Sequence, residues 1–168
     1  MSLPIERAQL IQLDEIPDRA KPWVQYDESI TLAVESVTGS VAKVKNLCQF
    51  KGPCPDWIPS HHQREQLSFI RHIELFSREQ RVLSAWSYTD PDGDLVEKLL
   101  ALGNQPLANL LFASGSSRSP TLHWIHAEGH GGRAIEWQVT GCASSLMLVE
   151  LFDATFVSRY APSEGLDR

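Results

Sequence analysis

The sequence predicts an α+β domain built on an antiparallel sheet. Two observations carry this prediction: helical patterns gather early and midway along the chain, and strand-like runs arrive as hairpins. The length of 168 residues suits one domain with a sizeable core. We therefore expect a single domain over residues 1–168, with no internal repeat.

The composition argues against several classes of protein. The net charge of −6 is opposite to the clustered basic surface that nucleic acids require, so we expect no nucleic-acid partner. No apolar run approaches the roughly 18 residues of a membrane helix, and the N-terminus lacks the order of a signal peptide. Three cysteines, an odd number, argue against a disulfide framework. We expect a cytoplasmic protein without a membrane span.

The N-terminal part contains one clear helix. Residues 5–13 have weak helical character, whereas residues 27–37 have a strong pattern that Asp27 can cap and Gly39 can end. Four apolar side chains recur there at the spacing of one buried helix face, namely Ile30, Ala33, Val34 and Val37.

The middle of the chain is typical of strands. Residues 40–50 form the first predicted strand, and residues 52–60 form a loop with three prolines. Residues 67–76 and 81–88 form two further strands, joined by a hairpin through residues 77–80.

Two short helices are predicted next. A turn at residues 90–93 leads into a helix that Asp94 caps, with Glu97 at the capping-box position, and that ends at Gly103. A second helix covers residues 106–113, and its first residue is a proline, as suits a first turn.

Three strand-like runs complete the predicted sheet, at residues 121–127, 134–140 and 144–152. We interpret the glycine-rich stretch 129–132 as the hairpin between the first two. Residues 157–168 are polar, and we expect a frayed tail there.

The last of these runs contains an unusual carboxylate. Six of the eight residues from Ser145 to Phe152 are large and apolar, which predicts a strand buried on both faces. Glu150 shares a face with Leu146, Leu148 and Phe152. A buried carboxylate needs a partner or a raised pKa, because it loses hydration.

A second strand repeats this feature with the opposite charge. Arg71 lies on a face that is otherwise apolar, made of Leu67, Phe69, Ile73 and Leu75. Two inward charges of opposite sign indicate either a structural ion pair or a site for a small anionic ligand. Lys45, Arg118 and Arg133 are possible auxiliary cations.

Motifs for other chemistry are missing from the sequence. We find no phosphate loop, dinucleotide fingerprint, nucleophile elbow or HExxH motif, so we expect no cofactor. Cys48 and Cys54 are six residues apart, with His61 and His62 beyond them. This first spacing is wider than zinc sites usually show, so we expect no metal.

Four motifs in order resemble the bacterial chorismate pyruvate-lyase family, which makes 4-hydroxybenzoate for ubiquinone. Residues 103–112 (GNQPLANLLF) resemble the family's LG-x-x-PLG-x-x-LF, and residues 148–152 (LVELF) resemble its LTELF. Residues 69–73 (FIRHI) are similar to its WLREI, and residues 27–31 (DESIT) to the DSMT start of a helix. The resemblance covers about residues 23–156.

This resemblance implies a fold and a site. It implies a chorismate lyase-like fold, with about six antiparallel strands, helices on one face and a ligand buried beneath helical flaps. It implies that Arg71 holds the aromatic carboxylate, that Glu150 lies at the reacting end, and that Ile30 and Leu107 are apolar pocket positions. We expect a monomeric lyase that eliminates pyruvate from chorismate. The alternative is a non-catalytic binding protein or sensor for 4-hydroxybenzoate or a related aromatic acid.

The chain departs from the family's motifs in two places. Trp86 stands where the family's AGRT segment has an arginine, and the W-x-R-R-S segment survives only as Gly132-Arg133-Ala134. Chorismate is a dianion, which an ionised Glu150 would repel. A protonated Glu150 could instead act as a general acid toward the leaving enolpyruvate, and this is the form that we hypothesise for the complex.

Overall fold

The computed structural model describes residues 3–58, 67–112 and 115–163. His61 and His62, considered above as metal ligands, lie outside the described residues. Among the residues that are described, no helix is long and apolar enough to span a membrane.

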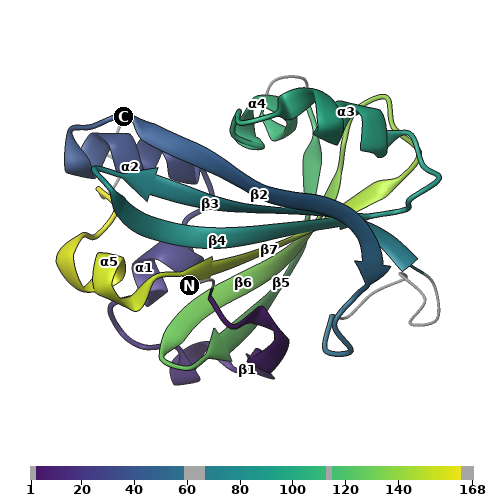
Figure 1. The fold of residues 1–168 in the computed structure, drawn as a ribbon. Coiled ribbons are helices and arrows are strands. Elements are labelled where there is room, and N and C mark those ends of the chain that lie inside the picture. Colours follow the sequence, from purple (N-terminus) through teal and green to yellow (C-terminus); the bar gives the residue numbers. More distant parts are fainter. Residues whose placement is uncertain (1–2, 59–66, 113–114, 164–168) are drawn as a thin grey trace.

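One antiparallel sheet organises the domain, in the strand order β1-β5-β6-β7-β4-β3-β2 (Figure 1). The strands within the described ranges are β1 (Gln9–Ile11), β2 (Ala42–Pro53), β3 (Leu67–Ser77), β4 (Gln80–Thr89), β5 (Ser117–Ala127), β6 (His130–Gln138) and β7 (Ser145–Phe152). The apolar run that contains Glu150 is the central strand, β7, which confirms that it is buried on both faces. The predicted hairpin of β3 and β4 is also confirmed, with Arg78 and Glu79 as its turn.

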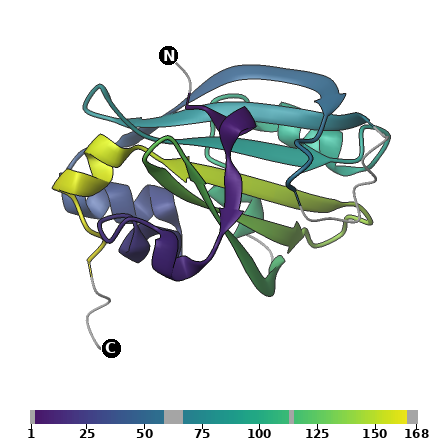
Figure 2. The same cartoon turned by 90° about the horizontal axis from the view of Figure 1, so that it is seen from below.

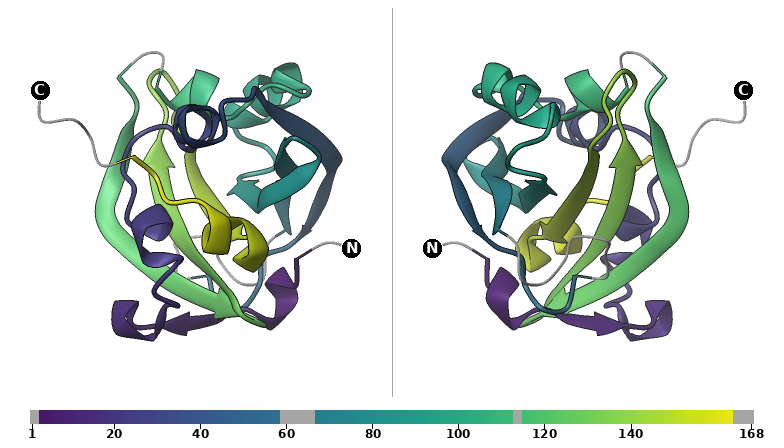
Figure 3. Two further views of the ribbon diagram at one scale, coloured as in Figure 1. Left: turned by 90° about the vertical axis from the view of Figure 1, so that its left-hand side faces the viewer. Right: turned by 90° about the vertical axis from the view of Figure 1, so that its right-hand side faces the viewer.

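All five α-helices of the described chain pack on one face of this sheet. They are α1 (Lys21–Val24), α2 (Ile30–Thr38), α3 (Leu95–Leu102), α4 (Ala108–Leu111) and α5 (Ala154–Arg159). Each contributes to a single apolar cluster with the inward side chains of β3, β4, β6 and β7. The sheet is strongly curved, and α2, α3 and α4 lie across its open side (Figure 3). This confirms the expected α+β class with helices on one face.

The opposite face of the sheet is covered by the N-terminal segment rather than by α-helices. The segment with η1 (Ile5–Arg7) and β1 crosses the strands on this side (Figure 2), and η2 (Leu13–Glu15) follows it. A second apolar cluster forms there, with Leu3, Ala8 and Ile58 packed on outward side chains such as Trp86 and Val149. Every central strand therefore supplies alternate residues to two separate cores.

The sheet has seven strands, not six, because residues predicted as weakly helical form β1. Gln9, Leu10 and Ile11 pair antiparallel with residues 124–126 of β5. The predicted loop 52–60 also begins too early, because β2 continues to Pro53. Strand β1 and the end of β2 are short or irregular in sequence. Their strand conformation depends on pairing with β5 and β3, and not on a local pattern of apolar residues.

Two helix caps differ from the predictions. Helix α2 begins one turn later than expected, because the Ser29 hydroxyl, and not Asp27, accepts a hydrogen bond from the Leu32 backbone N–H. Gly39 ends this helix in a left-handed conformation, as predicted. Asp94 precedes α3 but reaches away from it, and accepts hydrogen bonds from the backbone N–H groups of residues 143 and 144. These bonds lower the pKa of Asp94.

The C-terminal half contains three further corrections. Only Glu128 and Gly129 form the turn of the glycine-rich hairpin, and β6 already includes Gly131 and Gly132. The predicted second helix shortens to the four residues of α4. The predicted frayed tail begins too early, because α5 continues to Arg159 and its Val157 is buried in the core.

Candidate functional site

A cavity of about 70 Å³ lies between the concave face of the sheet and the helices that cover it. Its floor is made by inward side chains of β3, β4, β6 and β7, and its cover by the start of α2 and by α4. The volume is several times the roughly 10–15 Å³ that one water molecule needs. Ile30 and Leu107 both line it.

Arg71 is a buried cation on the floor of this cavity. Arg71 lies on β3, opposite Ser87 of β4, and only 1% of the residue is exposed. Its Nη2 donates hydrogen bonds to the carbonyl oxygens of Gly103 at 3.1 Å and Gln105 at 2.9 Å. Its Nε has no hydrogen-bond partner, and no described carboxylate pairs with it. Burial lowers the pKa of Arg71 because its positive charge is desolvated.

Glu150 has a different partner, Arg133 of the neighbouring strand β6. Arg133 Nε donates to Glu150 Oε1 at 2.9 Å, and the two side chains are 5% and 9% exposed. Arg133 Nη1 also donates to the carbonyl oxygens of Val24, at 3.2 Å, and Tyr26. This charge-assisted hydrogen bond gives Glu150 a charge partner inside the cavity. The sequence had suggested Arg133 only as an auxiliary cation.

The two anomalous charges share the cavity without pairing directly. Arg71 stands opposite Ser87, and Ser87 opposite Leu148, while Glu150 lies two residues further along β7. Two strand spacings and this two-residue offset place the Cα atoms of Arg71 and Glu150 roughly 12 Å apart. The alternative of a structural Arg71–Glu150 pair is therefore wrong, and Arg71 is left without a charge partner among the described residues.

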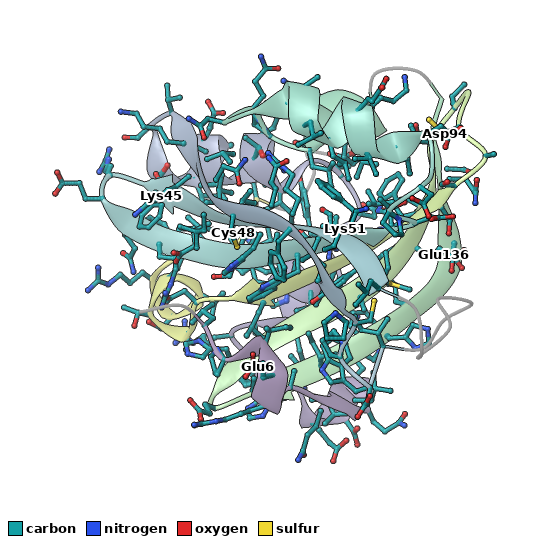
Figure 4. All side chains as sticks on the ribbon, turned by 45° about the vertical axis from the view of Figure 1, so that its right-hand side comes forward. Glu6, Lys45, Cys48, Lys51, Asp94 and Glu136 are labelled. Atoms are coloured by element: carbon teal, nitrogen blue, oxygen red, sulfur yellow. The ribbon has the colours of Figure 1, made fainter. Side chains whose placement is uncertain are left out.

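The auxiliary cations divide between the cavity and the surface. Arg118 of β5 is half-buried, lines the cavity and makes no ion pair within the described chain. Lys45 is exposed on the edge strand β2 and does not reach the cavity (Figure 4). Two acidic residues, Asp27 and Glu28, line the outer rim and are exposed.

Trp86 does not occupy the cavity at all. Strand β4 presents Leu83, Ala85 and Ser87 to the cavity, so the Trp86 side chain points to the opposite face of the sheet. Sequence reasoning missed Ser87 and Trp137 as cavity positions. Strand alternation, counted from Arg71 and Glu150 through the strand pairing, would have found both, but the pairing itself was unknown.

The described residues contain no group of three or more His, Cys, Asp or Glu side chains placed to hold a metal ion. Comparison with known protein families finds no family that matches the chain, and no curated protein matches it either.

Proposed function

We propose that this protein is a chorismate pyruvate-lyase-like enzyme, which eliminates pyruvate from chorismate to leave 4-hydroxybenzoate. The observation that supports this most is Arg71, a buried guanidinium that faces an apolar cavity and has only neutral acceptors. A buried cation without a counter-charge is costly for the fold. A ligand carboxylate would supply that counter-charge, and its geometry matches the planar fork of an arginine.

The charges of the cavity suit a dianion. Arg71, Arg118 and Arg133 contribute three positive charges to the interior and Glu150 one negative charge, a net charge of +2, while Asp27 and Glu28 add two negative charges at the exposed rim. Chorismate carries one carboxylate on its ring and one on its enolpyruvyl group. We assign the ring carboxylate to Arg71 and the enolpyruvyl carboxylate to Arg118, which lies four strands away across the curved sheet.

The elimination needs proton transfer and orientation but no redox partner. The ether bond between the ring and the enolpyruvyl oxygen breaks, and the neighbouring ring carbon, which bears the hydroxyl group, loses its proton as the ring becomes aromatic. The enolpyruvate takes up a proton at its methylene carbon and leaves as pyruvate, so the protons balance.

In this scheme Glu150 is the proton-transferring group. Glu150 is paired with the cation Arg133, and we assign its carboxylate the role of the general base that takes the ring proton. This assignment is opposite to the protonated form hypothesised from the sequence. The net positive charge of the three arginines offsets the repulsion between an ionised Glu150 and the dianion.

The covering helices must move for a substrate to enter. A cavity of about 150 Å³ accommodates benzene, whereas this one measures about 70 Å³. The segment between α3 and α4 is held closed by the Arg71 hydrogen bonds to Gly103 and Gln105. A ligand carboxylate would compete for the same guanidinium, so binding would loosen this segment and admit the ring.

The second candidate is a binding protein or sensor for 4-hydroxybenzoate or a related aromatic acid. The observation in its favour is that Glu150 is held in an ion pair by Arg133, which also donates to two backbone carbonyl oxygens. A carboxylate held by such a cation can serve as a fixed part of a binding site without taking part in proton transfer.

Incubation with chorismate separates the two candidates. The lyase predicts equal amounts of pyruvate and 4-hydroxybenzoate, measured by a coupled lactate dehydrogenase assay and by chromatography. The Glu150→Gln variant serves as the matched control for uncatalysed breakdown of chorismate. Absence of both products, together with calorimetric binding of 4-hydroxybenzoate, would support the binding protein instead.

A further inference from the structure

A second hollow lies on the opposite face of the sheet from the cavity. This groove has a volume of about 1040 Å³ and is bounded by the N-terminal segment, by β2 and by residues 53–57. Cys48 on β2 and Glu6 on η1 lie on its two sides (Figure 4). Arg71 and Glu150 do not line it. The proposed lyase activity leaves this groove unused.

The floor of the groove is an aromatic platform. His72 of β3 and Trp86 of β4 are cross-strand neighbours whose rings stack with centroids 4.5 Å apart and planes inclined by 13°. Ile70 and Tyr88 continue this floor, and both are buried. A stacked pair of flat rings beside apolar side chains presents a surface on which another flat ring packs well.

Two buried nitrogen atoms, in residues that line the groove, have no hydrogen-bond partner. One is Nε2 of His72, whose residue is only 9% exposed, and the other is Nε1 of Trp57. Both residues line the groove. A buried polar atom without a partner costs roughly 1–3 kcal/mol. An indole N–H can only donate, so a group that satisfies Trp57 must be an acceptor.

Among the described residues, the charged side chains around the groove leave no cation free for an anionic ligand. Arg7 forms an ion pair with Glu128, and Arg81 binds Glu74 at 3.1 Å and Asp153 at 3.0 Å. Burial lowers the pKa of His72, so its ring is neutral at pH 7. His130 also lines the groove and accepts a hydrogen bond from the Ala154 backbone N–H at 3.0 Å. Burial lowers the pKa of His130 as well.

We propose that this groove is a second binding site, for an uncharged, flat aromatic compound that carries a hydrogen-bond-accepting oxygen. The ring of the ligand stacks along the His72–Trp86 platform, and its oxygen accepts from Trp57 Nε1. Neutral His72 then supplies a second hydrogen bond through Nε2, as donor or acceptor. The described cations of the groove, Arg7 and Arg81, are already paired with carboxylates, which disfavours the carboxylate ligands that the cavity is proposed to take.

The test uses the full chain and 7-methoxycoumarin, an uncharged bicyclic compound with a carbonyl oxygen. Equilibrium dialysis should show saturable binding, and the anionic 7-methoxycoumarin-4-acetate should bind at least about tenfold more weakly, because its charge finds no partner. Trp57→Phe keeps the ring and removes the N–H, so it should weaken coumarin binding by about threefold to tenfold.

Two further variants locate the bound probe. His72→Phe keeps a stacked ring and removes the nitrogen atoms, so it should weaken binding by a similar factor. Arg71→Met, which alters only the cavity, should leave coumarin binding unchanged. The proposal is overturned if wild-type protein shows no saturable binding, if Trp57→Phe and His72→Phe both bind as wild type does, or if Arg71→Met abolishes binding. Thermal unfolding of each variant shows whether it is folded, and Trp57→Phe, at a half-buried position, decides the test if His72→Phe does not fold.

Discussion

Replacing Arg71 by methionine tests whether the fold or a ligand requires this arginine. The guanidinium is buried beside neutral carbonyl groups, and burial of an unpaired charge costs several kcal/mol. The two hydrogen bonds from Nη2 stabilise the folded state by about 1.5–3 kcal/mol each, or roughly 3–6 kcal/mol together. These terms nearly cancel, and methionine fills the space with a flexible apolar chain. We therefore expect Arg71→Met to change the free energy of unfolding by less than about 1.5 kcal/mol.

Arg133→Met is the matched comparison, because it removes the same guanidinium from the same sheet face. That change leaves Glu150 buried without its partner, which costs about 3–5 kcal/mol. Urea unfolding of both variants at pH 7, followed by tryptophan fluorescence, measures the two free energies. A ligand-binding Arg71 predicts a large difference between them.

Binding supplies the second half of the test. Arg71→Lys keeps the charge but loses the planar fork, so the affinity for 4-hydroxybenzoate should fall by about 1.5–3 kcal/mol, or roughly 10- to 150-fold. Arg19→Lys makes the same chemical change at an exposed position and should bind normally. Calorimetry measures both affinities. A folded Arg71→Lys variant of unchanged affinity, or a loss of more than about 3 kcal/mol of stability in Arg71→Met, would make Arg71 a structural residue.

Four further predictions concern turnover, release, pH and packing. Glu150→Gln should bind 4-hydroxybenzoate within about threefold of wild type but lose turnover, since an amide cannot transfer the proton; parental turnover would remove Glu150 from the mechanism. Product release should limit turnover because the helices must open, so stopped-flow mixing should show a burst, and a linear onset would contradict this. The free energy of unfolding should decrease as the pH falls below about 6.5. Burial lowers the pKa of His72 in the folded protein, although Glu74 opposes this shift, so the unfolded chain takes up a proton there first. His72→Phe should therefore reduce the slope of the unfolding free energy against pH. Gly132→Ala places a Cβ 2.3 Å from the Glu150 carbonyl oxygen and should cost about 1–3 kcal/mol in urea unfolding, whereas Gly141→Ala, which meets no atom within 4 Å, measures the cost of positive φ alone.

Local patterns predicted the central strands well because their side chains face two cores. The run around Glu150 and the hairpin of β3 and β4 have apolar residues on both faces, so their strand character is visible without any partner. Strand β1 is different: Leu10 is exposed and only three residues pair with β5. Its conformation depends on residues more than 100 positions away, which no local pattern reports.

The candidate site was predictable as individual charges but not as pairs. Arg71 and Glu150 stood out because each is a charge on an apolar strand face. Their partners depend on strand order, and β7 lies between β4 and β6, so the residue beside Glu150 comes from β6. The sequence left this order open. Arg133 was therefore considered only as an auxiliary cation, and it could not be foreseen that Trp86 faces away from the cavity.

The curved sheet separates two hollows with different chemistry, and neighbouring residues of one strand serve each of them. Arg71 faces a cavity whose interior holds three arginines and one glutamate, with two acidic residues at its rim. His72, the next residue, faces a groove whose described cations are already paired. Side chains of a strand alternate between its faces, so this division follows directly from the backbone. A carboxylate is therefore favoured on one side of β3 and disfavoured on the other. The two proposed ligand classes follow from this difference, because the same strand offers an unpaired guanidinium to the cavity and a neutral ring to the groove.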